Sequence, residues 1–276
     1  CKKPKKLTKK TVLLSSYLCH PSMANNELSG PIFLAAIYQR LLKWDQRNFD
    51  YLFVVNPETI GSICFLSEHG LELKTNMQAG LVMTCLGGPH KTLTYKLSRA
   101  GNSTMDKLFL HLEKEGKCLI RKFDPSIGGD ERQYCSSGFN LPVGQISKTV
   151  YGKYSEYHTS LDDKKFVELE DFLCNIDALE NILKIHDNML SLNREEPYCE
   201  MQLGKRGLYP NTNSPSTWTM SSDKLNDEKH VLKIISYILS YADGDNDLVD
   251  IANLSENNID DVLNVYNTLK SKMQFV

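Results

Sequence analysis

The stretch "TVLLSSYLCHPSMANNELSGPIFLAAIYQRLLKW" (residues 11–44) decides the fold, because its residue pattern changes twice along a short segment. Residues 11–19 are mostly β-branched and apolar over the length of a strand, and the Pro, Ser and Asn residues that follow are strand breakers. From Pro31 to Trp44 the apolar residues recur at helical spacing, and Pro31 suits the first turn of a helix. The stretch therefore predicts a strand, a polar loop and a helix.

The same alternation continues downstream. Further strands are expected over residues 51–57, 80–88 and 91–99, and helices over 61–70, 103–116 and 165–190. Gly70 is expected to close the first of these helices, and Ser103 and Gly116 to begin and end the second. Nearly all-apolar strands that alternate with helices indicate a mostly parallel sheet covered on both faces. We therefore predict an α/β domain of three layers, α/β/α, with a mostly parallel mixed sheet.

The pattern changes after this domain, which we assign to residues 1–192. Residues 193–227 are rich in Pro, Ser, Asn and Thr, and are expected to form a linker or an extended segment. Residues 228–276 predict three short helices with a tight middle turn, which is typical of a helix-turn-helix or winged-helix module.

Composition limits the classes of protein that the chain can represent. Its 276 residues, 41% hydrophobic and 24% charged, are typical of a globular protein, and no apolar run approaches the roughly 18 residues of a membrane span. Eight cysteines without a CxxC pair indicate reduced thiols, so we expect a cytoplasmic protein without membrane partners. The net charge of −2 argues against general nucleic-acid binding. Because the chain begins at Cys1 without Met, we expect that a piece is missing upstream.

Polar residues gather where the expected strands end. His20 follows the first strand, Glu58 the second and the segment 85–90 the third, while Asp130 with Glu131 and His158 lie in turn-rich stretches. Ligands at the ends of parallel strands meet at one edge of a sheet. Two imidazoles with several carboxylates predict a hydrolytic zinc site; the alternative is that both histidines are buried and hydrogen-bonded.

Several motifs in one order resemble a known family. The segments "CHPSMANNELSGP", "NPETIGS", "LVMTCLGG", "GGDERQYCSSGFNLPVG" and "YHTSLDD" closely resemble a bacterial aminopeptidase-like family of uncharacterised function. That family belongs with the zinc aminopeptidases, glutamate carboxypeptidases and glutaminyl cyclases. The resemblance covers Thr11 to about Tyr209, and the C-terminal segment is similar to the family's winged-helix tail. The full-length family also has an N-terminal segment with a small inserted domain, so the resemblance also implies a truncated chain.

The resemblance implies a partial metal site around two histidines. His158 and Asp162 match the family's last ligand motif, His-Thr-x-x-Asp. His20 matches the first ligand, but Ser22 stands where an aspartate usually orients the imidazole.

The carboxylate ligands of the zinc aminopeptidases are matched less well. The metal-bridging aspartate falls on Asn25, and Asn26 follows it. Of the usual Glu-Glu pair, only Glu58 is nearby, and the next carboxylate falls near Cys85. Asp130 matches an aspartate that lines the site, and we include it among the candidate ligands.

These substitutions predict one zinc rather than two, because a two-metal site needs several carboxylates to hold two divalent ions close together. We expect His20 and His158 to ligate the ion with a carboxylate or Asn25. Glu58 is then base or ligand, and Asp130 or Glu131 takes the other role. Around the ion, Ser22, Asn26 and Asp162 are expected to support the ligands. For the substrate, we assign Tyr157 to its binding and Arg132 to its carboxylate; the alternative for Arg132 is a structural ion pair.

The C-terminal module is acidic. Residues 228–276 hold eight acids and four lysines, which argues against DNA contact and favours a lid or a homo-oligomer surface. We therefore predict a zinc-dependent aminopeptidase-like hydrolase that cleaves a peptide or amide bond of a small substrate through a metal-activated water. The alternative is a weak or inactive relative that binds a ligand or partner through the same cleft.

Overall fold

The computed structural model describes residues 10–208, 222–273 and 275 of the chain. The chain divides into two compact units, Cys1–Asp187 and Asn188–Val276. In the described part of the predicted linker, a short 3-10 helix spans Gly204–Arg206, and helix α6 already begins at Ser222. The remainder of that linker, residues 209–221, lies outside the described residues.

The first unit is built around a six-stranded sheet. The predicted mixed, mostly parallel character of this sheet is confirmed, although the sequence predicted only four of its strands. Its spatial order is β2-β1-β3-β6-β4-β5, and every neighbouring pair is parallel except β4 with β6. All seven residues of β1 are buried, which suits a central strand covered on both faces. The strands span Thr11–Tyr17 (β1), Asp50–Asn56 (β2), Met77–Met83 (β3), Leu93–Lys96 (β4), Cys118–Arg121 (β5) and Val143–Ser147 (β6).

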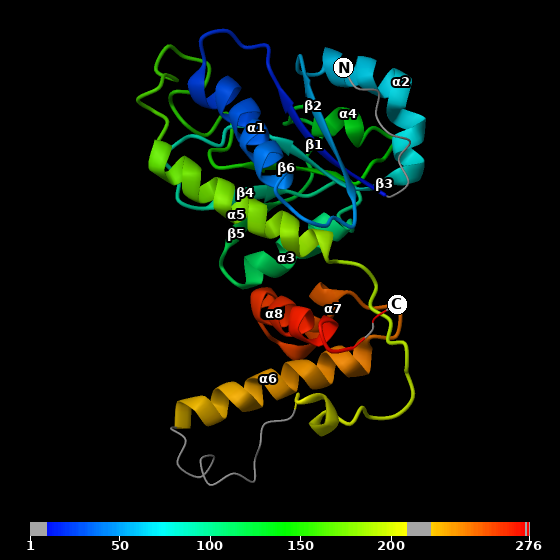
Figure 1. Ribbon diagram of the computed structural model, residues 1–276. Coiled ribbons are helices and arrows are strands. Elements are labelled where there is room, and N and C mark those ends of the chain that lie inside the picture. Colours follow the sequence, from blue (N-terminus) through cyan, green and yellow to red (C-terminus); the bar gives the residue numbers. More distant parts are fainter. Residues whose placement is uncertain (1–9, 209–221, 274, 276) are drawn as a thin grey trace. The chain divides into compact units, whose positions relative to one another are not determined.

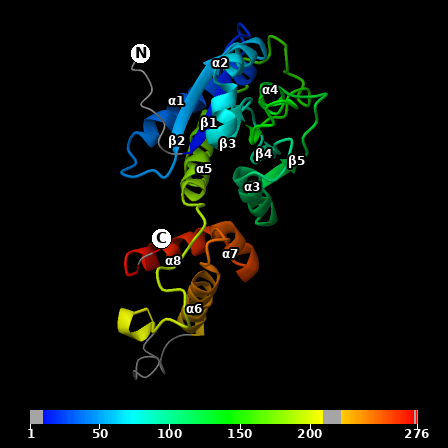
Figure 2. The same cartoon turned by 90° about the vertical axis from the view of Figure 1, so that its right-hand side faces the viewer.

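Helices cover both faces of this sheet. Helix α1 packs beside α5, and α2 lies beside the short α4 (Figures 1 and 2). Alternate strand residues face opposite layers: Leu13 and Val82 belong to the core cluster that includes Leu66 of α2 and Tyr134 of α4. The helices of this unit span Ser29–Leu41 (α1), Ile60–Asn76 (α2), Thr104–Lys114 (α3), Glu131–Tyr134 (α4) and Leu169–Asp187 (α5).

Two predicted helix signals have different outcomes. Ser103 is the N-cap of α3 and forms a reciprocal capping box with Asp106, which confirms the predicted helix start. The prediction that Gly70 ends a short helix is wrong, because α2 continues to Asn76. A Cβ at Gly70 would lie 2.3 Å from Cε1 of Phe139, so this glycine permits close packing rather than a helix stop.

Gly70→Ala is expected to destabilise the first unit. The methyl group would collide with the Phe139 ring, and overpacking of this kind costs about 1–3 kcal/mol, against a gain in helix propensity of at most about 1 kcal/mol. Hydrogen exchange of the β3 amides in the whole chain measures the change. The double variant Gly70→Ala/Phe139→Leu should recover part of the loss; stability equal to that of the parent in the single variant would contradict the packing account.

His186 predicts a pH-dependent stability. Its side chain is fully buried, Nε2 lies 2.8 Å from Oγ1 of Thr104, and Nδ1 has no partner among the described residues. Burial lowers the pKa of His186 from 6.5 to about 4. Between these values the unfolded chain binds the proton and the folded chain does not, so stability falls as the pH falls through this window.

The expected loss is about 3 kcal/mol between neutral pH and about pH 4. His186→Gln removes the titration and retains a neutral hydrogen-bonding group, so the stability of this variant should fall less over the same window. Urea unfolding, monitored by hydrogen exchange, measures the stability of the parent and of the variant at the two pH values. Identical pH slopes in the parent and the variant would show that His186 does not carry this dependence.

The second unit holds the three predicted C-terminal helices, Ser222–Tyr241 (α6), Leu248–Ser255 (α7) and Ile259–Lys270 (α8). Asp247 begins α7 with a capping box to Asp250. Isolated β-bridges join Asn193 with Asp243 and Arg194 with Phe275.

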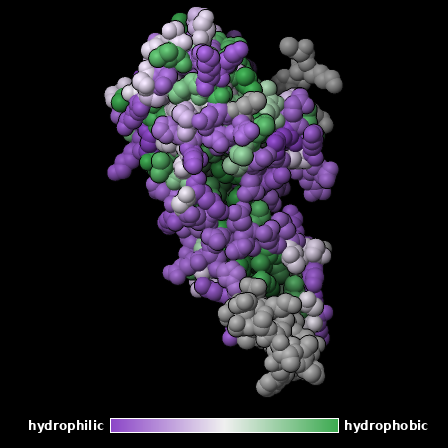
Figure 3. All heavy atoms as spheres, turned by 90° about the vertical axis from the view of Figure 1, so that its left-hand side faces the viewer, coloured by the Kyte–Doolittle hydropathy of each residue, from purple (hydrophilic) through white to green (hydrophobic). Residues whose placement is uncertain are grey.

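On the face drawn in Figure 3, hydrophilic residues dominate the described surface. Within the described ranges, no helix combines the length and apolar character that crossing a membrane requires.

Candidate active site

The candidate site lies beyond the carboxyl ends of β1, β2 and β3, where open α/β sheets bind ligands. His20 follows β1, Glu58 follows β2, and Cys85 follows β3. Between β1 and α1, the chain forms a π-helical turn, η1 (Ala24–Leu28). Such turns are frequent at functional sites, and this one carries the buried residues Asn25, Asn26 and Glu27.

The imidazole of His20 lies between two carboxylates. Its Nδ1 is 3.1 Å from Oε2 of Glu27, and its Nε2 is 3.6 Å from Oε2 of Glu58. Glu27 is 4% exposed, while His20 and Glu58 are 24% and 26% exposed. Glu27 thus orients the imidazole of His20 from its buried side. The resemblance gives this role to an aspartate at the position where this chain has Ser22. Ser22 itself is exposed, with a φ of 65°.

Asn26, not Asn25, lies among the site residues. The amide of Asn25 is occupied elsewhere, because Oδ1 accepts from the N–H of Gly87 at 2.8 Å and Nδ2 donates to Oγ1 of Thr149 at 2.7 Å. The prediction that Asn25 is a metal ligand therefore does not fit its surroundings. Asn26 lies 3.3 Å from Nε2 of His158 through Nδ2, and its Oδ1 accepts from Sγ of Cys85 at 3.3 Å.

Asp162 joins the segment that follows β1 to the segment that contains His158. The buried carboxylate of Asp162 accepts from the backbone N–H groups of Asn25 and Asn26 at 2.6 and 2.9 Å, and so fixes the start of η1. His158, at a φ of 56°, stacks on Tyr157 with ring centroids 4.0 Å apart. Its ring lies 5.5 Å from that of His20. The structure therefore brings His20, Asn26, Tyr157 and His158 together.

Three acidic or basic candidates have other partners. Oδ1 of Asp130 accepts from the N–H of Thr59 at 2.6 Å and from Oγ of Ser62 at 3.0 Å, so Asp130 holds the turn that follows Glu58. Glu131 is fully buried in an ion pair with Lys96, 3.0 Å from Nζ. The proposed proton-transfer role of Glu131 therefore does not fit its surroundings. The guanidinium of Arg132 is directed to loop carbonyls, of which Gly129 is one, at 3.4 Å.

Glu58 faces a small cavity of about 30 Å³, lined also by His20, Asn26 and Tyr157. Burial raises the pKa of Glu58, and Asp130 raises it further. The cavity also contacts Gln145 of β6, which is 1% exposed and whose two amide atoms have no hydrogen-bond partner among the described residues. Sequence reasoning missed Gln145, because it lies inside a strand. The full lining is Tyr17, His20, Asn26, Glu58, Gly128, Gly129, Gln145, Tyr151 and Tyr157.

Neither thiol at the site is an activated nucleophile. Burial raises the pKa of Cys85 to about 11. Burial likewise raises the pKa of Cys19, and the Glu27 and Glu58 carboxylates raise it further. A cysteine hydrolase needs the opposite shift.

Comparison with known proteins identifies the fold and the family. Residues 4–189 match the family model described as a domain of unknown function, DUF4910. The chain belongs to this family. Residues 191–273 match a winged helix-turn-helix model, which agrees with the predicted C-terminal module.

Two relatives from one organism resemble most of this chain. A Clostridium acetobutylicum protein, provisionally named a polysaccharide biosynthesis protein with an aminopeptidase-like domain, is 36% identical over 246 residues, which are 87% of this chain and 52% of that protein. A crystal structure of a provisionally named peptidase from the same organism is 30% identical, with a TM-score of 0.80 over 97% of this chain and 58% of that one. The chain thus spans somewhat more than half the length of these relatives. The predicted family resemblance is confirmed.

Zinc aminopeptidases share the fold. The zinc aminopeptidase of Bacillus subtilis matches 66% of this chain and 47% of its own at 15% identity, with a TM-score of 0.53. The aminopeptidase LapA of Legionella pneumophila matches 66% of this chain and 53% of its own at 12% identity, also with a TM-score of 0.53. At these identities the likeness shows the fold alone.

Proposed function

We propose that this chain is the hydrolase part of an aminopeptidase-like enzyme that cleaves a peptide or amide bond of a small substrate and uses one zinc ion. The observation that carries the proposal is the fixed imidazole of His20, held by Glu27 on one side and facing Glu58 on the other. A carboxylate on the far nitrogen of a metal-binding histidine fixes its tautomer and orientation.

The side chains fit one ion better than two. With Nδ1 of His20 directed to Glu27, Nε2 remains for a metal. The further donors would be His158, whose ring lies 5.5 Å from that of His20, and the amide of Asn26, which lies against His158. Two imidazoles and a carbonyl provide no negative charge, and the neutral Asn26 amide and Cys85 thiol bind each other. A pair of divalent ions would repel strongly there, so we assign a single zinc to His20, Asn26 and His158.

The residues of this chain then have separate tasks. A bound zinc would lower the pKa of a water molecule and polarise the substrate carbonyl. Glu58 receives the proton of the attacking water, and Asp130 holds the backbone of Thr59 so that Glu58 keeps its position. Tyr157 packs against His158 and lines the cavity, and we assign it to contact with the substrate.

A second function is favoured by one specific contact. The Cys85 thiol donates to the Asn26 amide at a place where a two-metal peptidase needs carboxylates. A relative that binds a ligand or a partner through the same cavity, without turnover, would tolerate this uncharged pair. The acidic second unit supports a protein surface, for example between copies of the chain, rather than a nucleic-acid surface.

Metal-stripped and zinc-reloaded protein, assayed against a panel of aminoacyl and amidated substrates, tests the first function. We expect hydrolysis of at least one substrate only after reloading, and loss of that hydrolysis in His158→Ala. Hydrolysis that does not depend on zinc would overturn the metal assignment. Absence of hydrolysis, together with saturable binding of one panel compound, would establish the binding function instead.

A further inference from the structure

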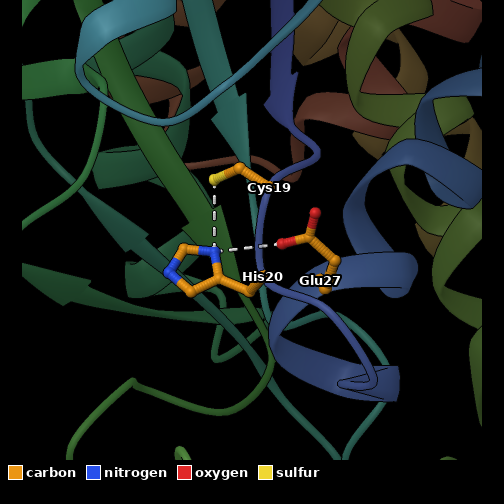
Figure 4. A group of neighbouring side chains, drawn as sticks. All are labelled: Cys19, His20 and Glu27. Carbon is orange, nitrogen blue, oxygen red and sulfur yellow. Dashed lines mark hydrogen bonds and ion pairs between the residues drawn. The ribbon is translucent and has the colours of Figure 1, made fainter.

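A second group of potential metal ligands lies around Nδ1 of His20, the ring nitrogen that the proposed catalytic zinc does not use. Sγ of Cys19 lies 3.4 Å from Nδ1, and Oε2 of Glu27 lies 3.1 Å from the same atom (Figure 4). Among the residues that the structure describes, these three have ligand atoms that all lie within 4.8 Å of one another. The other nitrogen, Nε2, lies 3.6 Å from Oε2 of Glu58.

The distances from Nδ1 of His20 to the sulfur of Cys19 and to the carboxylate of Glu27 suit a tetrahedrally coordinated ion. A zinc with bonds of about 2.3 Å to sulfur and about 2.0 Å to nitrogen and oxygen separates its ligands by about 3.3–3.6 Å. The two observed separations, 3.4 and 3.1 Å, lie close to these values. A thiolate, a carboxylate and a neutral imidazole also carry two negative charges, which balance a divalent cation.

The burial of Glu27 and the open pocket beside the three side chains further support a metal site. Glu27 is 4% exposed, and its one polar side-chain partner in the described part of the chain is His20. A buried carboxylate is normally paired with a positive charge or a metal. Cys19, His20 and Glu27 also line an open pocket of about 340 Å³, which leaves room for a fourth ligand from solvent; the other lining residues are Leu18, Pro21, Ser22, Met23 and Leu28.

We propose that Cys19, His20 and Glu27 form a divalent-cation site, selective for zinc-like ions, that competes with the catalytic use of His20. A neutral imidazole ligates through one nitrogen, so an ion on Nδ1 leaves the proton on Nε2, directed to Glu58. The ion at this site and the zinc of the proposed hydrolase therefore exclude each other. The site stands on its own contacts and does not depend on that hydrolase function.

Cobalt(II) titration of the full chain tests the site, because a thiolate ligand gives a near-ultraviolet charge-transfer band. We expect this band in the parent, in His158→Ala and in Cys85→Ser, and its loss in Cys19→Ser. Glu27→Gln should weaken cobalt binding by at least about tenfold, since it removes a charged ligand. The other exposed thiols, Cys64, Cys174 and Cys199, are unchanged in every variant.

Three results would overturn the site. The first is a band that persists in Cys19→Ser and disappears in Cys85→Ser, which would place the ion beside Asn26. The second is cobalt binding without a thiolate band that is lost in His158→Ala, which would leave the hydrolase proposal intact and refute this one. The third is no cobalt binding by the folded chain.

Discussion

Glu58→Gln is expected to lower the rate of hydrolysis of the best panel substrate by about 10²–10⁴-fold, because the amide cannot accept the proton of the attacking water. The side chain keeps its shape, so the zinc content of the reloaded protein should stay unchanged. The sequence predicted three acidic candidates, Glu58, Asp130 and Glu131. Of these three, Glu58 alone lines the cavity. Steady-state kinetics and elemental analysis of the same sample measure both quantities.

Glu68→Gln is the matched control for this substitution. It makes the same chemical change on α2, at a side chain that is 78% exposed, and should leave the rate unaltered. Loss of zinc in Glu58→Gln would make Glu58 a ligand rather than the base. A rate equal to that of the parent would remove Glu58 from the mechanism.

Lys96→Met is expected to destabilise the first unit by about 3–5 kcal/mol, because it leaves the buried carboxylate of Glu131 without its cation. Nζ of Lys96 also donates to the carbonyls of Asp124 and Ile127, at 2.9 and 2.6 Å. These bonds hold the loop that leads to the cavity-lining Gly128 and Gly129. Hydrogen exchange of the β3 amides measures the loss.

The double variant Lys96→Met/Glu131→Leu provides the control. Replacing both members of a buried ion pair by apolar side chains is often close to neutral, so this variant should regain most of the lost stability. A single variant as stable as the parent would show that the pair carries little of the folding free energy. Recovery of stability without recovery of hydrolysis would show that Lys96 also positions the loop beside the cavity.

Local signals in the sequence predicted much of the fold. The central strands and the Ser103 cap depend on neighbouring residues, so their patterns are visible in a single chain. Strand β6 was missed because Val143–Ser147 follows a turn-rich stretch, and its pairing with β3 and β4 is set by residues far away in the chain. Gly70 was misread for the same reason, since its partner Phe139 is distant in sequence.

The site was predicted in outline and differs in detail. His20 and Glu58 could be found because they follow strands, and the structure brings them together. The sequence could not show how Asn25 and Asn26 differ, because a π-helical turn directs these consecutive side chains to different surroundings. Glu27 was missed because the expected orienting carboxylate lay two residues after the histidine, whereas the observed one lies seven residues after it and reaches back. A carboxylate in the segment that opens the following helix is the signal that would have revealed it.

Zinc stoichiometry of the reloaded chain tests the central claim, one catalytic zinc held through His20, most directly. Measured in the Cys19→Ser background, where the second proposed site lacks its thiolate, elemental analysis should find one tightly held zinc per folded chain, lost when His20→Ala or His158→Ala is added. Two zinc ions per chain, or a zinc content unchanged by both substitutions, would contradict the account.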